Sequence, residues 1–149
     1  MAKEKSREFI KALGPLKSSG FSPWAIYTHA CHETGYFRRV AGKHNYWRIE
    51  KPARWQGPVA RDWDQDDGAN TLMEFVDWES CDEALAFYAA LVEKIYPESF
   101  AARACHNCFL RGLAKWDADS AYSDKLLALY DLLRGEEQVG RDFNVLLPA

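Results

Sequence analysis

The sequence has no apolar run close to the roughly 20 residues that a membrane-spanning helix needs, so we expect no membrane insertion. It has no internal repeat, low-complexity segment or Gly/Ser-rich linker, which favours a single domain over residues 1–149. The first residues, MAKEKSREFIKAL, lack the apolar core and the small-residue cleavage site of a secretory signal. We therefore expect a protein made in the cytoplasm without a signal peptide, and we expect it to be a monomer.

A large excess of positive charge is also missing. The net charge of -3 argues against a nucleic-acid partner held by phosphate contacts. Cys105 and Cys108 flank His106-Asn107 like half of a zinc site, but the sequence has no second Cys/His pair to complete the ligand set. We expect neither a metal nor an organic cofactor.

Aromatic side chains, in contrast, are abundant, because they make up 14% of the chain and include six Trp. Most such rings belong in a core, whereas exposed ones are typical of clefts that bind sugars. Charge is unevenly placed, since residues 36–57 are basic and residues 58–83 carry nine carboxylates against one cation, Arg61. A basic loop beside an acidic segment suits the steering of an anionic polymer.

Helix signals recur along the chain. Apolar spacing and capping residues predict helices over about residues 6–13, 22–34, 98–112 and 119–134. A further helix follows the capping box formed by Ser80 and Glu83 and stops before Pro97. The last helix is expected to bury Leu126, Leu127, Leu129, Leu132 and Leu133, and the tail over residues 136–149 to dock through Phe143, Val145, Leu146 and Leu147.

Residues 36–57 show no steady period and contain Gly42, Pro52 and Gly57, so we expect a long ordered loop. Residues 59–65 and 70–78 have the pattern of two strands around Asp66-Asp67-Gly68, because Asp-Gly supplies the positive φ of a tight hairpin. The expected fold class is α+β and mostly α, with a helical domain and one small hairpin lobe.

Glu33 is the residue whose position most needs an explanation. Ile26, Ala30 and Glu33 follow one another at i, i+4 and i+7, so the carboxylate continues an apolar helix face. Burial and the negative end of the helix dipole both disfavour its charged form and raise its pKa. Such a carboxyl suits a general acid, whereas the alternative is an ion pair with Arg38 or Arg39.

Four segments in order resemble glycoside hydrolase family 73, the bacterial β-N-acetylglucosaminidases of autolysins, flagellar rod muramidases and phage lysins. HACHETGY at residues 29–36 and NYWRI at 45–49 are similar to the family's Leu-Glu-Ser-Gly-Trp-Gly and Asn-Leu-Phe-Gly-Ile-Lys. FVDWESCDEAL at residues 75–85 resembles its Phe-Arg-x-Tyr-x-Ser segment. KWDADSAYSDKL at residues 115–126 resembles Gly-Tyr-Ala-Thr-Asp-Pro-x-Tyr-Ala-x-Lys-Leu, so the likeness covers roughly residues 20–134.

The resemblance implies a lysozyme-like fold with a cleft between the helical body and the hairpin, and cleavage of the β-1,4 bond after N-acetylglucosamine in peptidoglycan. Glu33 matches the family's catalytic Glu. Asp62 falls where the family often carries a second carboxylate in its first strand. Glu74 is the competing candidate, although a position opposite Arg61 explains it as a cross-strand ion pair. Asp64, or the substrate's own N-acetyl group, is the remaining alternative.

The resemblance also points to candidate substrate-binding residues. The aromatic ones are Tyr46, Trp47, Trp63, Trp116 and Tyr122, with core packing as the alternative for Trp47. Asn45 matches a family Asn and is expected to fix the loop behind Glu33. Two departures stand out. Trp116 replaces a family Tyr, whose hydroxyl role is either lost or passed to a group such as Tyr122. Arg48 replaces a Gly, and we expect it to narrow the cleft or to contact a carboxylate of the substrate.

The sequence therefore favours a peptidoglycan hydrolase, an endo-β-N-acetylglucosaminidase, that acts on the cell wall after delivery by a phage or a secretion machine. A lytic transglycosylase or muramidase on the same fold is one alternative. A catalytically silent glycan-binding module is the other.

Overall fold

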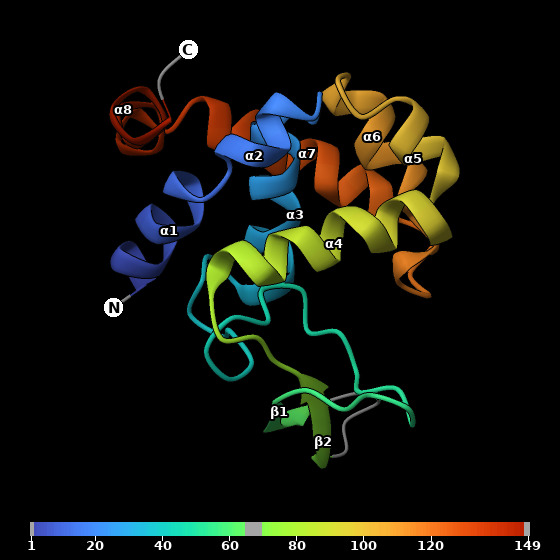
Figure 1. Ribbon diagram of the computed structural model, residues 1–149. Helices are drawn as coiled ribbons and strands as arrows, with labels where there is room; N and C mark the ends of the chain where they lie inside the picture. Colours follow the sequence, from blue (N-terminus) through green and yellow to red (C-terminus); the bar gives the residue numbers. More distant parts are fainter. Residues whose placement is uncertain (1, 65–69, 148–149) are drawn as a thin grey trace.

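The computed structural model describes residues 2–64 and 70–147, which form a helical body and a two-stranded hairpin (Figure 1). This arrangement confirms the predicted fold class, while the predicted turn at Asp66-Asp67-Gly68 lies outside the described residues. None of the helices in these ranges has both the length and the apolar character to cross a bilayer. The elements are α1 (Ala2–Lys11), α2 (Gly14–Ser18), α3 (Pro23–Thr34), β1 (Val59–Asp64), β2 (Thr71–Val76), α4 (Cys81–Ile95), α5 (Pro97–Ala101), α6 (His106–Gly112), the 3-10 turn η2 (Ala114–Trp116), α7 (Tyr122–Arg134) and α8 (Glu137–Leu146).

The central helix, α3, begins and ends where the sequence predicts. The Ser22 hydroxyl accepts a bond from the N–H of Ala25 at 3.3 Å, and Pro23 occupies the first turn. At the other end Gly35 takes a left-handed φ of 56°, and the N–H of Tyr36 donates to a carbonyl of the last turn. In Figure 1, α3 runs through the middle of the body, where it contacts α1, α6 and α7.

Two predicted helices differ from the structure. Gly14-Pro15 opens the short α2 after α1, because Pro fits a first helical turn. The single helix predicted over residues 98–112 is wrong, since α5 and α6 are separate. Between them the Arg103 carbonyl accepts the N–H of Ser22 at 2.7 Å, and the Cys105 sulfur caps α6. A contact with the start of α3 therefore interrupts the helix.

Predictions about α4 and α7 hold in part. The Ser80 hydroxyl accepts the N–H of Glu83 at 3.1 Å, but the Glu83 carboxylate bonds the N–H of Glu79 instead of that of Ser80. In α7, Leu126 and Leu133 are buried, and Leu127 and Leu129 pack partly against the core. Leu132 is 56% exposed, because it lies about 100° around the helix from Leu133.

The tail docks on the body as the helix α8. Phe143 is buried and stacks on Trp24 with ring centroids 4.0 Å apart, and Leu146 and Leu147 pack partly against the core. Val145 is 71% exposed, so its predicted burial is wrong. It lies on the opposite side of α8 from the docking face.

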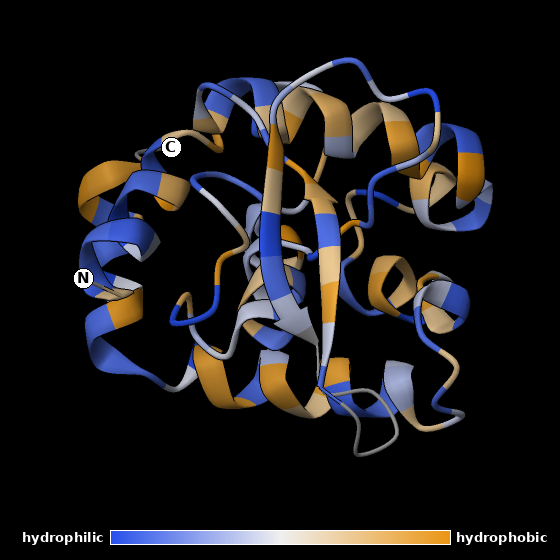
Figure 2. Ribbon diagram, turned by 90° about the horizontal axis from the view of Figure 1, so that it is seen from below, coloured by the Kyte–Doolittle hydropathy of each residue, from blue (hydrophilic) through white to orange (hydrophobic). Residues whose placement is uncertain are grey.

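The hairpin pairs β1 and β2 antiparallel, in a register that sets Arg61 opposite Glu74. The loop segment at residues 49–51 runs along the other edge of β2. There the N–H of Lys51 donates to the Glu74 carbonyl at 2.9 Å, and the N–H of Val76 donates to the Ile49 carbonyl at 3.1 Å. Seen from below, the strands cross the middle of the helical body (Figure 2). The loop thus connects the hairpin to the body.

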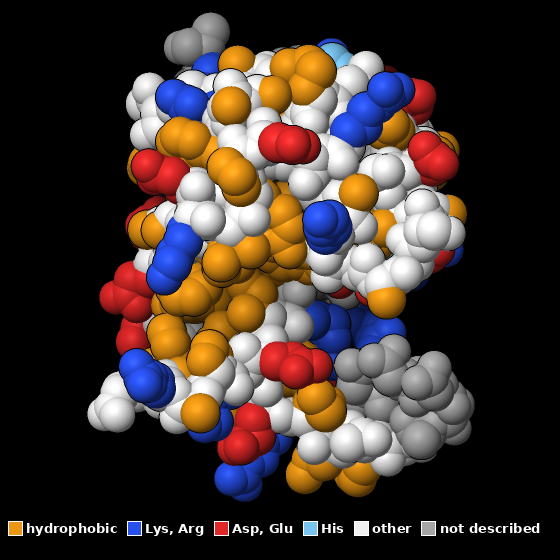
Figure 3. Space-filling view, turned by 90° about the vertical axis from the view of Figure 1, so that its right-hand side faces the viewer, with side chains coloured by type: hydrophobic (Ala, Val, Ile, Leu, Met, Phe, Trp, Pro, Cys, Tyr) orange, Lys and Arg blue, Asp and Glu red, His pale blue; other side chains and the backbone are white. Residues whose placement is uncertain are grey.

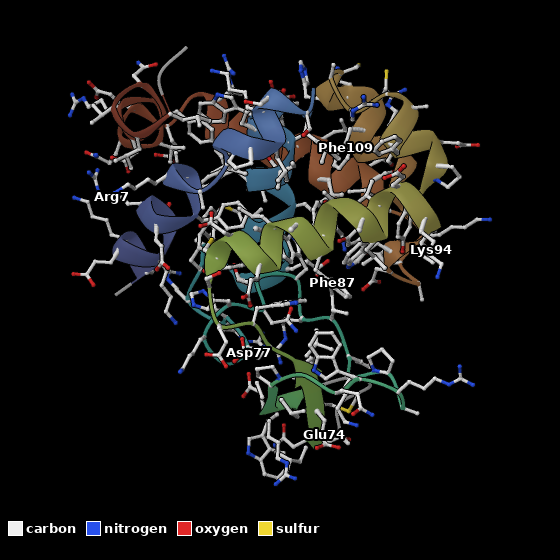
Figure 4. The ribbon with its side chains drawn as sticks, in the orientation of Figure 1. Arg7, Glu74, Asp77, Phe87, Lys94 and Phe109 are labelled. Carbon is white, nitrogen blue, oxygen red and sulfur yellow. The ribbon has the colours of Figure 1, made fainter. Side chains whose placement is uncertain are left out.

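The loop over residues 36–57 is ordered, as predicted, by two buried polar side chains. The Asn45 amide donates to the carbonyls of Ile49 and Val76 at 2.9 and 2.8 Å, and its oxygen accepts the N–H groups of Ile49 and Trp47. Asp77 lies where β2 leads back to the body (Figure 4), and it accepts backbone N–H groups from this loop. These bonds fix the loop between α3 and the hairpin.

Candidate active site

Glu33 lies near the C-terminal end of α3, and its side chain is only 16% exposed. Burial is the largest influence on this carboxyl and raises its pKa from 4.5 to about 7. A hydrogen bond from Tyr122 and the charge of Arg48 act in the opposite direction, and the charge of Asp117 adds to the rise. Among the described residues Glu33 forms no ion pair with Arg38 or Arg39, and its one near basic partner is His29 at 3.9 Å. Burial, and not pairing with a surface arginine, therefore has the largest effect on its protonation.

The Tyr122 hydroxyl donates a short hydrogen bond to Oε1 of Glu33. Tyr122 is 2% exposed, so it contacts Glu33 from the protein interior and has no ring face open to a sugar. On its other side the same hydroxyl lies 3.0 Å from Nε2 of His29, whose Nδ1 lies 2.7 Å from the Tyr88 hydroxyl. Four side chains from α3, α4 and α7 thus form one continuous row that ends at Glu33.

A hollow of about 410 Å³ is lined by Arg48 and Tyr96, two residues that interact electrostatically with Glu33. Figure 3 shows the depression on the right-hand face of Figure 1, with hydrophobic side chains on its floor. Trp116 and Tyr96 line it as a stacked pair with centroids 5.4 Å apart, and both are half-buried. Arg48, another lining residue, is near enough to Glu33 to lower the pKa of that carboxyl. The hollow can therefore hold a flat ligand against aromatic rings within reach of the acid.

Asp62 extends from β1 and is bound by Arg48, with Nη1 to Oδ2 at 2.9 Å. Burial by itself raises the pKa of Asp62, but the bond from Arg48 and the N–H of Trp63 outweigh it, so the pKa lies below its ordinary value. Arg48 also stacks on Phe75 and donates to two backbone carbonyls. Arg48 therefore acts electrostatically on both Glu33 and Asp62.

Two other candidate residues of the hairpin, Glu74 and Trp63, lie on its exposed surface. Glu74 is opposite Arg61, with Nε to Oε2 at 3.5 Å, as the cross-strand alternative predicts. In Figure 4 Glu74 lies at the far end of the lobe from the helical body. The Trp63 side chain is 56% exposed and keeps an open ring face. The side chain of Asp64 lies outside the described residues.

Tyr46 and Trp47 do not provide open platforms, because each is only 1% exposed. Trp47 stacks on Tyr88 with centroids 4.2 Å apart, which confirms the core-packing alternative. Trp47 nevertheless lines the hollow, and its buried indole N–H has no acceptor among the described residues. Asn45 is fully buried and bonds only to backbone in the described ranges, so it positions the loop as predicted.

Sequence reasoning assigned no role to His29, Tyr88 or Tyr96. The one signal was the spacing of His29 four residues before Glu33, which places both on one helix face. The exposed Cys105 and Cys108 have sulfurs 2.8 Å apart. Within residues 2–64 and 70–147 no three His, Cys, Asp or Glu side chains gather as a metal site would require.

A half-buried acid at the end of a central helix, an aromatic hollow beside it and a small hairpin lobe define the lysozyme-like class of α+β domains. Solved structures of this architecture overlay the chain over nearly its whole length. They include a peptidoglycan hydrolase from Sphingomonas sp. A1, at 18% identity and a TM-score of 0.71 over 96% of both chains. No family model matches the sequence, and no curated protein does.

Two further structures show the same likeness. The glycoside hydrolase domain of FlgJ from Salmonella typhimurium has 23% identity and a TM-score of 0.67, covering 95% of this chain and 97% of that one. The catalytic domain of the autolysin Auto from Listeria monocytogenes has 16% identity and a TM-score of 0.62, covering 95% and 84%. Identities of this size establish the shared fold.

Proposed function

We propose that the protein is a peptidoglycan hydrolase, an endo-β-N-acetylglucosaminidase that cleaves β-1,4 glycosidic bonds with Glu33 as its general acid. The main supporting observation is the half-buried carboxyl of Glu33, whose pKa is raised to about 7 and which interacts electrostatically with two residues that line an aromatic hollow. Structural neighbours described as peptidoglycan and glycoside hydrolases support this reading. The substrate is the glycan strand of the bacterial cell wall.

In the proposed reaction the protonated Glu33 gives its proton to the glycosidic oxygen as the bond from that oxygen to C1 breaks. Positive charge develops on the sugar ring, and water adds to C1 and loses a proton. Because only the protonated form of Glu33 is active, we expect turnover to fall as pH rises above about 7. Measurement of turnover as a function of pH tests this decline.

We propose Asp62 as the second carboxylate. Its lowered pKa keeps it ionised in the range where Glu33 is protonated, so the two carboxyls take opposite roles. Asp62 is 40% exposed and can accept the proton of an attacking water once substrate displaces part of its contact with Arg48. Glu74 remains the competing candidate, with its carboxylate engaged by Arg61.

The walls of the hollow suit an N-acetylated sugar. Trp116 and Tyr96 offer aromatic surface for stacking, and Trp63 offers a second ring on the lobe. The buried indole N–H of Trp47 has no acceptor among the described residues, and it would match an N-acetyl carbonyl oxygen if substrate binding exposed it. Arg48 would contact a carboxylate of the peptide that peptidoglycan carries by exchanging one of its present bonds, which go to Asp62 and to two backbone carbonyls.

The decisive experiment measures lysis of purified cell walls by the wild type, Glu33→Gln, Asp62→Asn and Glu74→Gln. We expect Glu33→Gln to lose about 10²–10⁴-fold in rate with its fold intact. Asp62→Asn should lose more of the lysis rate than Glu74→Gln. The reverse order would identify Glu74 as the second catalytic carboxylate. Full activity in Glu33→Gln would contradict the proposal and favour the silent binding module.

Product analysis separates the alternatives on the same fold. Mass spectrometry of digested walls should show reducing N-acetylglucosamine ends. Reducing N-acetylmuramic acid ends would instead identify a muramidase. Anhydro-muramic ends would identify a lytic transglycosylase, which expels the product without adding water.

A further inference from the structure

The row that ends at Glu33 contains a histidine that is fully buried. His29 is 0% exposed, and its ring packs edge-on against Trp116 with centroids 4.4 Å apart. Burial lowers its pKa to about 3, so the ring is neutral under working conditions. A neutral imidazole has one N–H and one acceptor nitrogen, and both nitrogens of His29 face tyrosine hydroxyls. Only one of two tautomers can therefore be present at a time.

The partners of the row decide between the two tautomers. Tyr122 donates its only hydroxyl proton to Oε1 of Glu33, so it must accept from His29 at its oxygen. Nε2 of His29 then carries the proton, and Nδ1 accepts from the hydroxyl of Tyr88 at 2.7 Å. Every donor in this direction meets an acceptor, from Tyr88 through His29 and Tyr122 to Glu33.

The opposite direction leaves a buried group unsatisfied. If Glu33 donated to Tyr122, then Tyr122 would donate to Nε2 and His29 would donate from Nδ1 to Tyr88. The Tyr88 hydroxyl is completely buried and has no second partner within the described ranges, so its proton would have no acceptor. A buried donor without an acceptor costs more than the bond it replaces gains. The surroundings of Tyr88 therefore fix the direction of all three bonds.

We propose that His29 is a positioning residue which, as the Nε2–H tautomer, makes Tyr122 a permanent donor to Oε1 of Glu33. The acid's own proton is thereby confined to Oε2, because an oxygen that already accepts a bond is the poorer site for it. This rests on the proposed function, since the benefit is a proton held on one defined oxygen for transfer to substrate.

The other groups around Glu33 do not supply this orientation. Tyr96 between α4 and α5, Asp117 before α7 and Arg48 from the loop interact with its carboxylate through charge, and in the described ranges none of them forms a hydrogen bond with either oxygen. His32 lies on the same helix against the Tyr122 ring, at a centroid distance of 5.2 Å. These charges shift the pKa of the carboxyl as a whole, whereas a hydrogen bond to Oε1 distinguishes one oxygen from the other.

The test reads the tautomer directly by long-range proton–nitrogen NMR of the full chain labelled with ¹⁵N-histidine. We expect a neutral His29 protonated at Nε2 from pH 5 to 8. In Tyr88→Phe the two tautomers should mix, because neither direction then satisfies both nitrogens. Tyr27→Phe is the matched control, since it removes a buried hydroxyl that bonds Ser6 and Cys31 and no member of the row, and it should leave the signal unchanged.

Turnover provides the second measurement. We expect His29→Leu and Tyr88→Phe to lower kcat by about three- to tenfold with little change in KM, the size of one lost hydrogen bond. His29→Gln, which keeps a donor, should recover part of the loss. An imidazolium or an Nδ1–H tautomer in the wild type would overturn the assignment, as would unchanged kcat in His29→Leu. An inactive wild type with the Nε2–H tautomer would instead contradict the proposed function alone.

Discussion

The helical body and the hairpin lobe hold their carboxylates by different means. In the body, Glu33 is 16% exposed and its bond from Tyr122 is backed by a buried histidine and a second tyrosine. In the lobe, Asp62 is 40% exposed and is held by one arginine side chain and a backbone N–H. The body therefore sets a protonation state in advance, whereas the lobe supplies a charge whose position depends on one ion pair.

Two tryptophans provide the largest contrast between the regions. Trp47 is buried against Tyr88, so Trp47→Ala should lower the free energy of unfolding by about 3–5 kcal/mol. Trp63 is 56% exposed on the lobe, and Trp63→Ala should change the free energy of unfolding by less than about 0.5 kcal/mol. Urea unfolding followed by circular dichroism measures both. Equal losses would show that the lobe is packed as firmly as the body.

The stability of Glu33→Gln should depend on pH. The folded state binds the Glu33 proton more tightly than the unfolded state, so wild-type stability is lost as pH rises from 4.5 through about 7. The Gln variant has no proton to lose. At pH 8 its free energy of unfolding should exceed that of the wild type by up to about 3 kcal/mol, and near pH 4 the two should be equal. Thermal unfolding at both pH values measures the difference. Glu74→Gln, on the exposed lobe, is the control and should show no such gain.

Arg48→Met should loosen the lobe without unfolding the body. The variant loses the charge-assisted bond to Asp62, which is partly screened by solvent, so we expect a cost of about 1 kcal/mol. Hydrogen exchange should become faster in β1 and β2 and stay unchanged in α3. Uniformly faster exchange would mean that the two regions unfold together.

The smallest expected effect belongs to the outer pair of the lobe. Arg61 and Glu74 are 69% and 46% exposed, and exposed ion pairs contribute between 0 and about 1 kcal/mol. Arg61→Gln should therefore leave the unfolding midpoint nearly unchanged, both in low salt and in 1 M salt. A clear loss in low salt that disappears in high salt would give this pair a structural role.

The features predicted from sequence are those that depend on neighbouring residues. Ser22, Pro23 and Gly35 define α3 locally, and the spacing from Ile26 to Glu33 places the acid on the buried face. The partners of His29 are 59 and 93 residues away along the chain, and no local pattern indicates them. The break between α5 and α6 likewise depends on a bond from Ser22.

Aromatic content predicted a ring-lined cleft without identifying the rings. Trp47, Trp63 and Trp116 belong to the same residue type, yet one is buried, one is exposed and one is half-buried. Their environments follow from the register of the hairpin and from the path of the loop. Arg48 was predicted to narrow the cleft or to contact substrate, and its bond to Asp62 follows from that path as well.

The four bonds of Asn45 also make its position sensitive to deamidation. Deamidation would convert this side chain to aspartate, which would direct a carboxylate oxygen at the carbonyls of Ile49 and Val76 in place of two N–H groups. Replacement of a single nitrogen by oxygen would thus turn two attractions into repulsions where the loop meets β2. The placement of the lobe therefore depends on the chemical identity of one atom in a buried amide.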